Sequence, residues 1–285
     1  MNFIPSLPLA QWIEDGLNFL TRNYSGVTRG IARLTETGID LLNTGLLAVP
    51  EWLFIVLFAL LCWRMSGRHL AVGAVLGLGL IWNLGLWVAT IQTLTLVVLA
   101  TIVAIVIAIP VGIIAALSQR IYRVVMPLLD FMQTMPAFVY LIPAIPFFGI
   151  GSVSAIFATV IFSMPPAIRL TIFGIRQVPT DLIEAADAYG ASRRQKLFKV
   201  QLPLALSTIM AGINQTIMLA LSMVVIAAMI GADGLGSEVW RAIQRLRPGD
   251  GFVAGIAVVI LAMLLDRLSQ SLQNGKPNQA DNGNQ

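Results

Sequence analysis

The chain has 285 residues, of which 57% are hydrophobic and only 11% charged, against about 25% charged residues in an ordinary soluble domain. No charged residue occurs in 70–119, 131–168 or 202–232, and a spanning helix needs about 20 apolar residues. This composition excludes a soluble globular protein, whereas the net charge of +4 identifies no partner by itself.

The first predicted segment, residues 1–48, is amphipathic. Its apolar residues recur at helical spacing with charged residues between them, which predicts one or two helices lying in the membrane interface. Residues 1–23 lack the basic start and cleavage site of a secretory signal, so we expect this end to be retained. The pattern rests on Leu9, Trp12, Ile13, Gly16, Leu17 and Leu20, with Glu14, Asp15 and Arg22 between them.

About seven membrane-spanning helices are predicted within residues 49–270. The first run is short and reaches spanning length only if part of 46–50 joins it. A polar tail follows at 271–285, and we expect it to be disordered because it has too few apolar residues to offset the cost of ordering. The sequence thus predicts an all-α polytopic membrane protein. The runs are 52–63, 70–87, 92–117, 124–148, 153–175, 204–232 and 252–265.

Basic residues predict the orientation of these spans, because loops rich in Lys and Arg stay in the cytoplasm. Twelve of them fall on alternate loops and the C-terminal tail, which predicts a cytoplasmic C-terminus. The loops at 88–90 and 149–152 have none, although 233–251 carries three arginines. The twelve are Arg64, Arg68, Arg120, Arg123, Arg169, Arg176, Arg193, Arg194, Lys196, Lys199, Arg267 and Lys276.

Two of the spans contain polar residues that are suited to a water-filled passage. Hydrogen bonds between helices explain the same residues equally well. Prolines 136, 143 and 146, and the pair at 165 and 166, are expected to kink or break helices, which is common around transport pathways. The candidate passage residues are Gln133, Thr134, Phe138 and Tyr140 in one span, and Asn214, Gln215 and Thr216 in the other.

Isolated reactive residues give no sign of a catalytic or metal site. Cys62 is the only cysteine and His69 the only histidine, so the chain alone builds neither a disulfide nor a paired imidazole site. Asp130 is the one acid within a spanning run. We expect it to pair with a basic group or water near the cytoplasmic end, with gating as the alternative role.

A charge-rich interval at 177–203 interrupts the apolar core and predicts two short cytoplasmic helices. Thr180 is expected to cap the first, and Gly190 to take the left-handed position after its last turn. Ser192 and Gln195 form a capping-box pattern for the second helix, which Pro203 is expected to end. Such a hairpin suits docking to a partner. An ordinary basic loop at the lipid headgroups remains open, and a DNA-reading helix-turn-helix is improbable in so apolar a chain.

The hairpin residues carry a resemblance to a known family. Glu184-Ala185-Ala186, then Gly190, then Val200-Gln201-Leu202-Pro203 resembles the EAA loop of ABC importer permeases, with Val200 in place of the usual Ile. Residues 133–140, 164–169 and 211–215 resemble the glycine betaine/proline betaine permeases in particular. The resemblance covers about residues 94–270. It implies that Glu184, Ala185, Ala186, Gly190, Val200, Leu202 and Pro203 fit a groove on the ATP-hydrolysing subunit.

The resemblance further implies a permease in the bacterial inner membrane, working as a homodimer with two ABC ATPase subunits and an external solute-binding protein. The chain contains no Gly-x-x-x-x-Gly-Lys-Ser/Thr loop, so ATP and Mg²⁺ are expected on the partner ATPase and no cofactor on this chain. The expected solute is glycine betaine or a related osmolyte. Choline, carnitine or an amino acid is the alternative, and a scaffold that recruits an ATPase without moving any solute is the rival reading.

Overall fold

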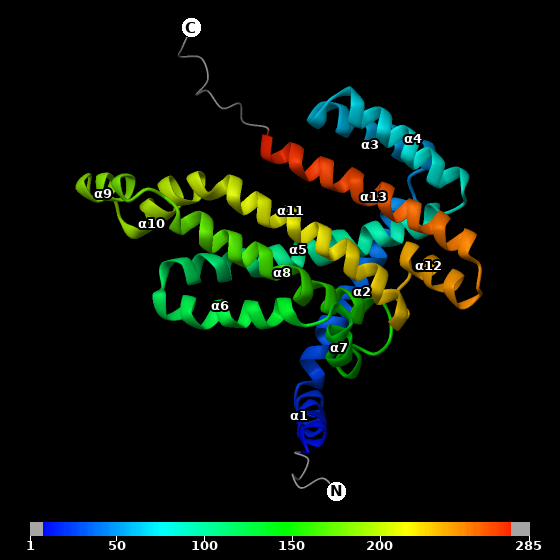
Figure 1. Cartoon of the computed structure of the whole chain (residues 1–285), viewed down its shortest axis with the longest axis horizontal. Helices are drawn as coiled ribbons and strands as arrows, with labels where there is room; N and C mark the ends of the chain where they lie inside the picture. Colours follow the sequence, from blue (N-terminus) through cyan, green and yellow to red (C-terminus); the bar gives the residue numbers. More distant parts are fainter. Residues whose placement is uncertain (1–7, 275–285) are drawn as a thin grey trace, which may run out of the picture.

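A computed structural model describes residues 8–274, and every regular element in that range is a helix (Figure 1). This confirms the all-α prediction. Residues 275–285 of the predicted polar tail lie outside the described residues. The elements are α1 (Leu9–Asn23), α2 (Ser25–Leu47), α3 (Glu51–Ser66), α4 (Arg68–Asn83), α5 (Trp87–Leu117), α6 (Gln119–Thr134), η1 (Ala137–Tyr140), α7 (Leu141–Phe148), α8 (Ser152–Arg176), α9 (Thr180–Ala188), α10 (Arg193–Lys196), η2 (Leu197–Gln201), α11 (Leu202–Ala227), η3 (Ala228–Ile230), α12 (Leu235–Gln244) and α13 (Pro248–Asn274).

Each of the seven predicted runs is helical, but they differ in length. Within residues 8–274, four segments can cross a membrane as single helices, namely α5, α8, the stretch Arg193–Ile230 and α13. Two bent pairs, α2 with α3 and α6 with η1 and α7, raise the count to six. The one predicted run left out of this count is 70–87, which corresponds to α4. That helix has 16 residues, and at 1.5 Å per residue it is shorter than the roughly 30 Å of a hydrocarbon core.

The predicted span 124–148 is divided by a bend of 112° between α6 and the η1–α7 segment. Pro136 lies at this bend and has no N–H, so the carbonyl of Met132 loses the donor that a continuous helix would supply. The hydroxyl of Tyr140 donates to that carbonyl instead. The predicted proline break is therefore confirmed here, whereas α8 continues as one helix through Pro165 and Pro166.

Helix α8 forms the centre of the bundle because glycines let its neighbours approach closely. A Cβ at Gly112 of α5 would lie 2.6 Å from Cβ of Thr171, and one at Gly212 of α11 would lie 3.1 Å from Cα of Ala167. On α8 itself, a Cβ at Gly174 would lie 3.2 Å from Cβ of Ala205. Small residues at such contacts are the usual means by which membrane helices associate. Helices α5, α8 and α11 thus form one tightly packed unit.

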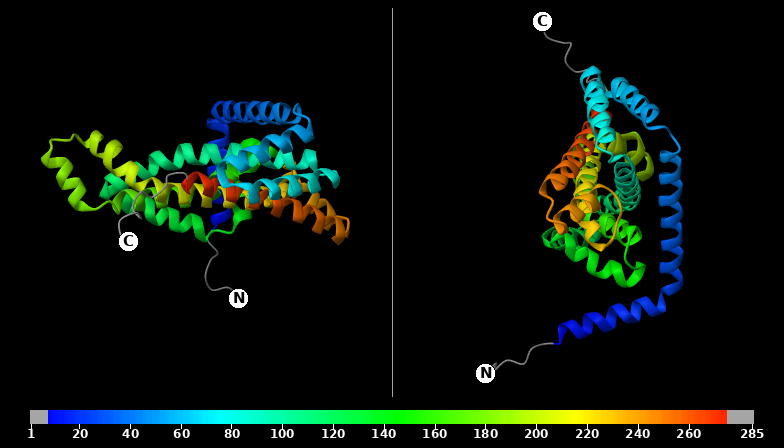
Figure 2. Two further views of the ribbon diagram at one scale, coloured as in Figure 1. Left: turned by 90° about the horizontal axis from the view of Figure 1, so that it is seen from above. Right: turned by 90° about the vertical axis from the view of Figure 1, so that its right-hand side faces the viewer.

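The amphipathic segment folds as two helices, α1 and α2, outside the bundle (Figure 2). Their apolar side chains are largely exposed, and Ile39 is the one residue of the pair that is buried. Helix α2 packs on α5, where Gly38 faces the side chain of Leu99. The prediction of one or two amphipathic helices is confirmed, while their place in the membrane interface stays a prediction.

Candidate functional site

The predicted hairpin projects from one end of the bundle, which we call the hairpin end (Figure 1). Its first helix, α9, begins at Thr180, and Pro179 occupies the capping position with extended backbone angles. The prediction that Thr180 caps this helix is therefore wrong. Because the residue before a helix must leave helical geometry and Pro179 already does so, Thr180 becomes the first helical residue.

The turn of the hairpin is the one predicted from Gly190. That glycine has a left-handed φ of 72°. Its N–H donates to the carbonyl of Asp187, and the N–H of Ala191 donates to the carbonyl of Ala186. These two bonds form a Schellman motif, which satisfies carbonyls that the end of the helix leaves free.

The second helix of the hairpin begins with the predicted capping box. The amide of Gln195 donates to the hydroxyl of Ser192 at 3.3 Å, and the amide of Ser192 donates to the side chain of Gln195 at 2.7 Å. An ion pair of 2.6 Å between Lys196 and Asp187 joins the two helices. The first helix therefore has a defined end, the second has a defined beginning, and an ion pair links the two.

Pro203 does not end this second helix, so that prediction is wrong. Residues Leu197–Gln201 form a π-helical turn, and the chain continues directly into α11. Wide turns of this kind accommodate a proline, which has no N–H and crowds the carbonyl four residues earlier. As a result, the hairpin joins α11 without an intervening loop.

The outer surface of the hairpin carries the motif residues. Glu184 and Ala185 are exposed, and Ala186 is half-buried. Exposed apolar side chains lie around them: Leu182 is 44% exposed, Phe198 63% and Tyr189 93%. On the second helix, Val200 and Leu202 are half-buried and Pro203 is exposed. Exposed apolar side chains beside charged residues such as Glu184 make this surface suited to docking against another protein.

The sequence predicts Arg176 only as a cytoplasmic charge, but the structure places it where three helices meet. It is the last residue of α8. Its guanidinium donates to the carbonyls of Ala116 at 3.2 Å and Ala115 at 3.5 Å, and to the side chain of Gln119 at 2.9 Å. It also lies 3.8 Å from the ring centroid of Tyr122. No local sequence signal could have indicated these contacts.

The sequence predicts that Asp130 pairs with a basic group or water, and the structure pairs it with Arg169, at 2.6 Å from α6 to α8. The carboxylate side chain is 63% exposed and that of the arginine 36%. This pairing supports the structural role that we expected for Asp130 near the hairpin end.

The candidate passage residues fall into two groups. Gln133 and Thr134 are exposed at the end of α6, and Phe138 is 58% exposed in η1. Gln215 is exposed on α11. These four side chains remain available to contact a solute.

The other three candidates are already engaged within the protein. Tyr140 is buried against the broken span, and Thr216 is buried and donates to the carbonyl of Gly212. Asn214 donates to Asp266 of α13 at 3.0 Å and accepts from Ser269. These contacts agree with the alternative reading of hydrogen bonds within and between helices. The seven residues therefore do not form one continuous polar line.

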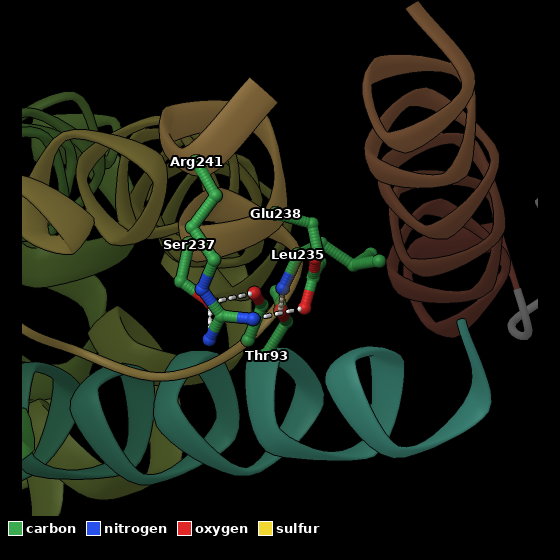
Figure 3. Close-up of polar contacts among 6 residues, drawn as sticks. Thr93, Leu235, Ser237, Glu238 and Arg241 are labelled. Carbon is green, nitrogen blue, oxygen red and sulfur yellow. Dashed lines mark hydrogen bonds and ion pairs between the residues drawn. The ribbon is translucent and has the colours of Figure 1, made fainter. Parts of the chain in front are cut away.

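At the opposite end of the bundle, α12 begins directly against α5 (Figure 3). The N–H of Leu235 donates to the hydroxyl of Thr93 at 2.8 Å, and this hydroxyl donates to the carbonyl of Ala89 at 2.9 Å. Gly234 has a φ of 119°, and a Cβ there would lie 2.5 Å from the Thr93 hydroxyl oxygen. Arg241 donates to Glu238 at 2.9 Å on the next turn. We call this the α12 end.

A polar cavity of about 510 Å³ lies at the same end. Glu36 and Asp40 of α2 line it together with Gln92 of α5 and Asp233. The sequence does not predict this cavity, because its residues come from segments far apart in the chain. The cavity lining makes the α12 end polar at the point where α2 crosses the bundle.

Comparison with known proteins identifies relatives along almost the whole chain. The family model described as "Binding-protein-dependent transport system inner membrane component" matches residues 108–274. The glycine betaine transport system permease protein OpuAB of Bacillus subtilis (strain 168) is 50% identical over 273 residues, which is 96% of this chain and 97% of that protein. The glycine betaine/carnitine transport permease protein GbuB of Listeria monocytogenes is 53% identical over 272 residues, covering 94% and 96%.

A solved structure has the same fold at lower sequence identity. An inward-facing conformation of the MetNI methionine ABC transporter matches with a TM-score of 0.60 and 24% identity, over 65% of this chain and 92% of that one. This similarity supports the fold alone.

Proposed function

The chain belongs to the family of binding-protein-dependent transport system inner membrane components, and from this premise we propose that it moves glycine betaine, or a closely related osmolyte, into the cell. It is the permease subunit of an ABC importer, a multi-pass protein of the inner membrane. Two relatives that match over more than nine-tenths of this chain are named as a glycine betaine permease and a glycine betaine/carnitine permease, and the solute that both names share favours glycine betaine.

The geometry of the hairpin is the observation that carries the mechanism. Its helices leave directly from α8 and α11, which pack tightly on each other in the core. The proposed contacts with the ATPase come from both halves of the hairpin. They are Glu184, Ala185, Ala186 and Gly190 in the first half, and Val200, Leu202 and Pro203 in the second half. When the partner ATPase binds ATP and Mg²⁺, the displaced hairpin moves α8 and α11 together.

The proposed importer contains further subunits besides this chain. Two copies of this chain, two ATPase subunits and one external solute-binding protein form the importer, with the hairpin and the C-terminus in the cytoplasm. The permease needs no ATP site or other cofactor of its own. Selection of the solute lies mainly in the binding protein, where aromatic side chains can hold a quaternary ammonium group.

The proposed passage runs along Gln133, Thr134, Phe138 and Gln215. All four are exposed side chains of the spans or of the break between α6 and α7. A break in a membrane helix is tolerated where it lines a cavity, which supports placing the passage beside η1.

The orientation has a direct test. Cysteines replace Gln195 in the hairpin and Leu246, which is 88% exposed near the α12 end, in a Cys62→Ser background. A membrane-impermeant thiol reagent should label the first only from the cytoplasm and the second only from outside. Labelling of both from one side would contradict the orientation.

Solute transport is tested in vesicles that contain this chain, the ATPase and the binding protein. We expect ATP-dependent accumulation of labelled glycine betaine that exceeds the accumulation of labelled carnitine or choline, each assayed separately. Stronger accumulation of another solute would overturn glycine betaine as the substrate. ATPase binding to the hairpin with no accumulation of any of them would support the scaffold reading instead.

A further inference from the structure

Two arginines of α8 hold α6 at two separate points. Arg169 and Arg176 are seven residues apart and therefore lie on one face of the helix, two turns from each other. Arg169 binds Asp130 at 2.6 Å in the second half of α6. Arg176 binds Gln119 at 2.9 Å and lies 3.8 Å over the ring of Tyr122 in the first half. Helix α6 is thus attached to α8 near both of its ends.

Arg176 also holds the end of α5. The last helical residue of α5 is Leu117, so the carbonyls of Ala115 and Ala116 have no helical N–H to accept from. The Arg176 guanidinium supplies donors to both, at 3.5 and 3.2 Å. A planar group with five N–H donors can serve these carbonyls, the Gln119 side chain and an aromatic face at once, whereas the lysine ammonium has only three donors and no plane.

The position of Arg176 in the chain places it between the hairpin and the rest of the bundle. It ends α8, and α9 begins four residues later at Thr180. Helix α6 leads from the Arg176 contacts to Gln133 and Thr134, directly before the bend of 112°. Arg176 therefore connects the residues that lead into the hairpin with the helix that leads into the broken span.

We propose that Arg176 is a positioning residue that makes α6 follow the hairpin, with the Arg169–Asp130 pair as the second attachment. The proposal rests on the proposed function, because it needs an ATPase to displace the hairpin. In each cycle Arg176 moves the start of α6 together with α8, and the Asp130 pair keeps the end of α6 aligned. The break at Pro136 then opens or closes the passage beside it.

The test compares variants in vesicles containing the chain, its ATPase and its binding protein, at matched protein levels. The readout is glycine betaine accumulated per ATP hydrolysed. Arg176→Ala should lower this ratio about tenfold, within the usual range of coupling between sites. The ratio of Arg176→Lys should lie between those of the parent and Arg176→Ala. Arg120→Ala is the matched control, because it removes an exposed charge at the same end of α6 and should leave the ratio unchanged.

Two further variants separate coupling from simple helix capping. Tyr122→Leu removes the ring beneath the guanidinium and should lower the ratio about threefold, the scale of an exposed cation-π contact. Tyr122→Phe keeps the ring and should behave as the parent does. The thermal midpoint of each purified complex is measured in parallel, since a structural role alone would lower the midpoint and leave the ratio intact.

The outcomes distinguish this inference from the proposed function. If the parent accumulates no glycine betaine, the proposed function fails. If the parent does so and Arg176→Ala has the same ratio as Arg120→Ala, the inference about Arg176 is overturned. If Arg176→Ala does not assemble, Tyr122→Leu decides, and a parental ratio for that variant overturns the inference.

Discussion

At the hairpin end, the last carbonyls of α5 accept hydrogen bonds from the long side chain of Arg176, whereas at the α12 end the hydroxyl of Thr93 accepts one from the backbone of Leu235. Arg176 is an exposed residue, and its hydrogen bonds reach 3.5 Å. Thr93 is fully buried, and Gly234 fits against it with no room for a Cβ. The Arg176 contacts join three helix ends through one side chain, whereas the Thr93 contacts lock α12 against α5 by close packing.

This difference indicates where the bundle can move. Helix ends joined by one side chain can shift together as a unit, while close backbone packing has few alternative arrangements. We therefore expect the α12 end to act as the fixed part of α5 and the hairpin end as the part that responds to a partner. Substitutions at the α12 end should accordingly lower stability, and substitutions at the hairpin end should lower transport.

The largest effect is expected from Gly234→Ala. The new Cβ would lie 2.5 Å from the Thr93 hydroxyl oxygen, and the φ of 119° is itself unfavourable for alanine. Together these should cost about 3 kcal/mol, measured as loss of folded protein and of the thermal midpoint in detergent. Gly249→Ala is the control, because its Cβ would meet nothing within 4 Å. Equal stability of the two variants would contradict the tight packing.

Thr93→Val should have a smaller but clear effect. The valine keeps the shape and leaves the buried N–H of Leu235 without its acceptor, which costs about 1–3 kcal/mol. Thr90→Val is a matched control, since the Thr90 hydroxyl donates only to the carbonyl of Leu86 in its own helix turn. Thermal unfolding of the purified complexes measures the difference, and equal midpoints would show that the Leu235 bond does not fix α12 on α5.

Gly190→Val should cost least in stability and act mainly on transport. The φ of 72° is strained for a β-branched residue by about 1 kcal/mol or more, in a hairpin that stands outside the core. We expect normal insertion, weaker binding of the ATPase and reduced uptake. Gly190→Asn should retain more activity, because asparagine tolerates this backbone region. Normal uptake and ATPase binding by Gly190→Val would refute the assigned turn.

The features predicted correctly from the sequence are those set by neighbouring residues. The Gly190 turn and the Ser192–Gln195 capping box depend on spacings of a few residues, and the break at Pro136 follows from a missing N–H. The two wrong details, at Thr180 and Pro203, involve a choice between adjacent residues or a wide helical turn that local patterns do not specify.

The features that the sequence did not predict join distant segments. Arg176 reaches residues about 60 positions earlier, and Asn214 bonds to Asp266 and Ser269 on α13. Only the packing of α5, α8, α11 and α13 brings these groups together. For the same reason, the polar residues of α11 could not be divided beforehand between passage and helix contact.

The central claim is that the hairpin converts ATP hydrolysis into solute movement, and Glu184→Ala tests it most directly. Glu184 is exposed near the start of α9, so its loss should cost at most about 1 kcal/mol of local helix stability and leave assembly intact. The measurement is glycine betaine accumulated per ATP hydrolysed in reconstituted vesicles, for the parent and the variant at matched protein levels. We predict that uptake falls much further than basal hydrolysis, so the ratio drops. An unchanged ratio would contradict the coupling role of Glu184 and leave it a solvated helix residue.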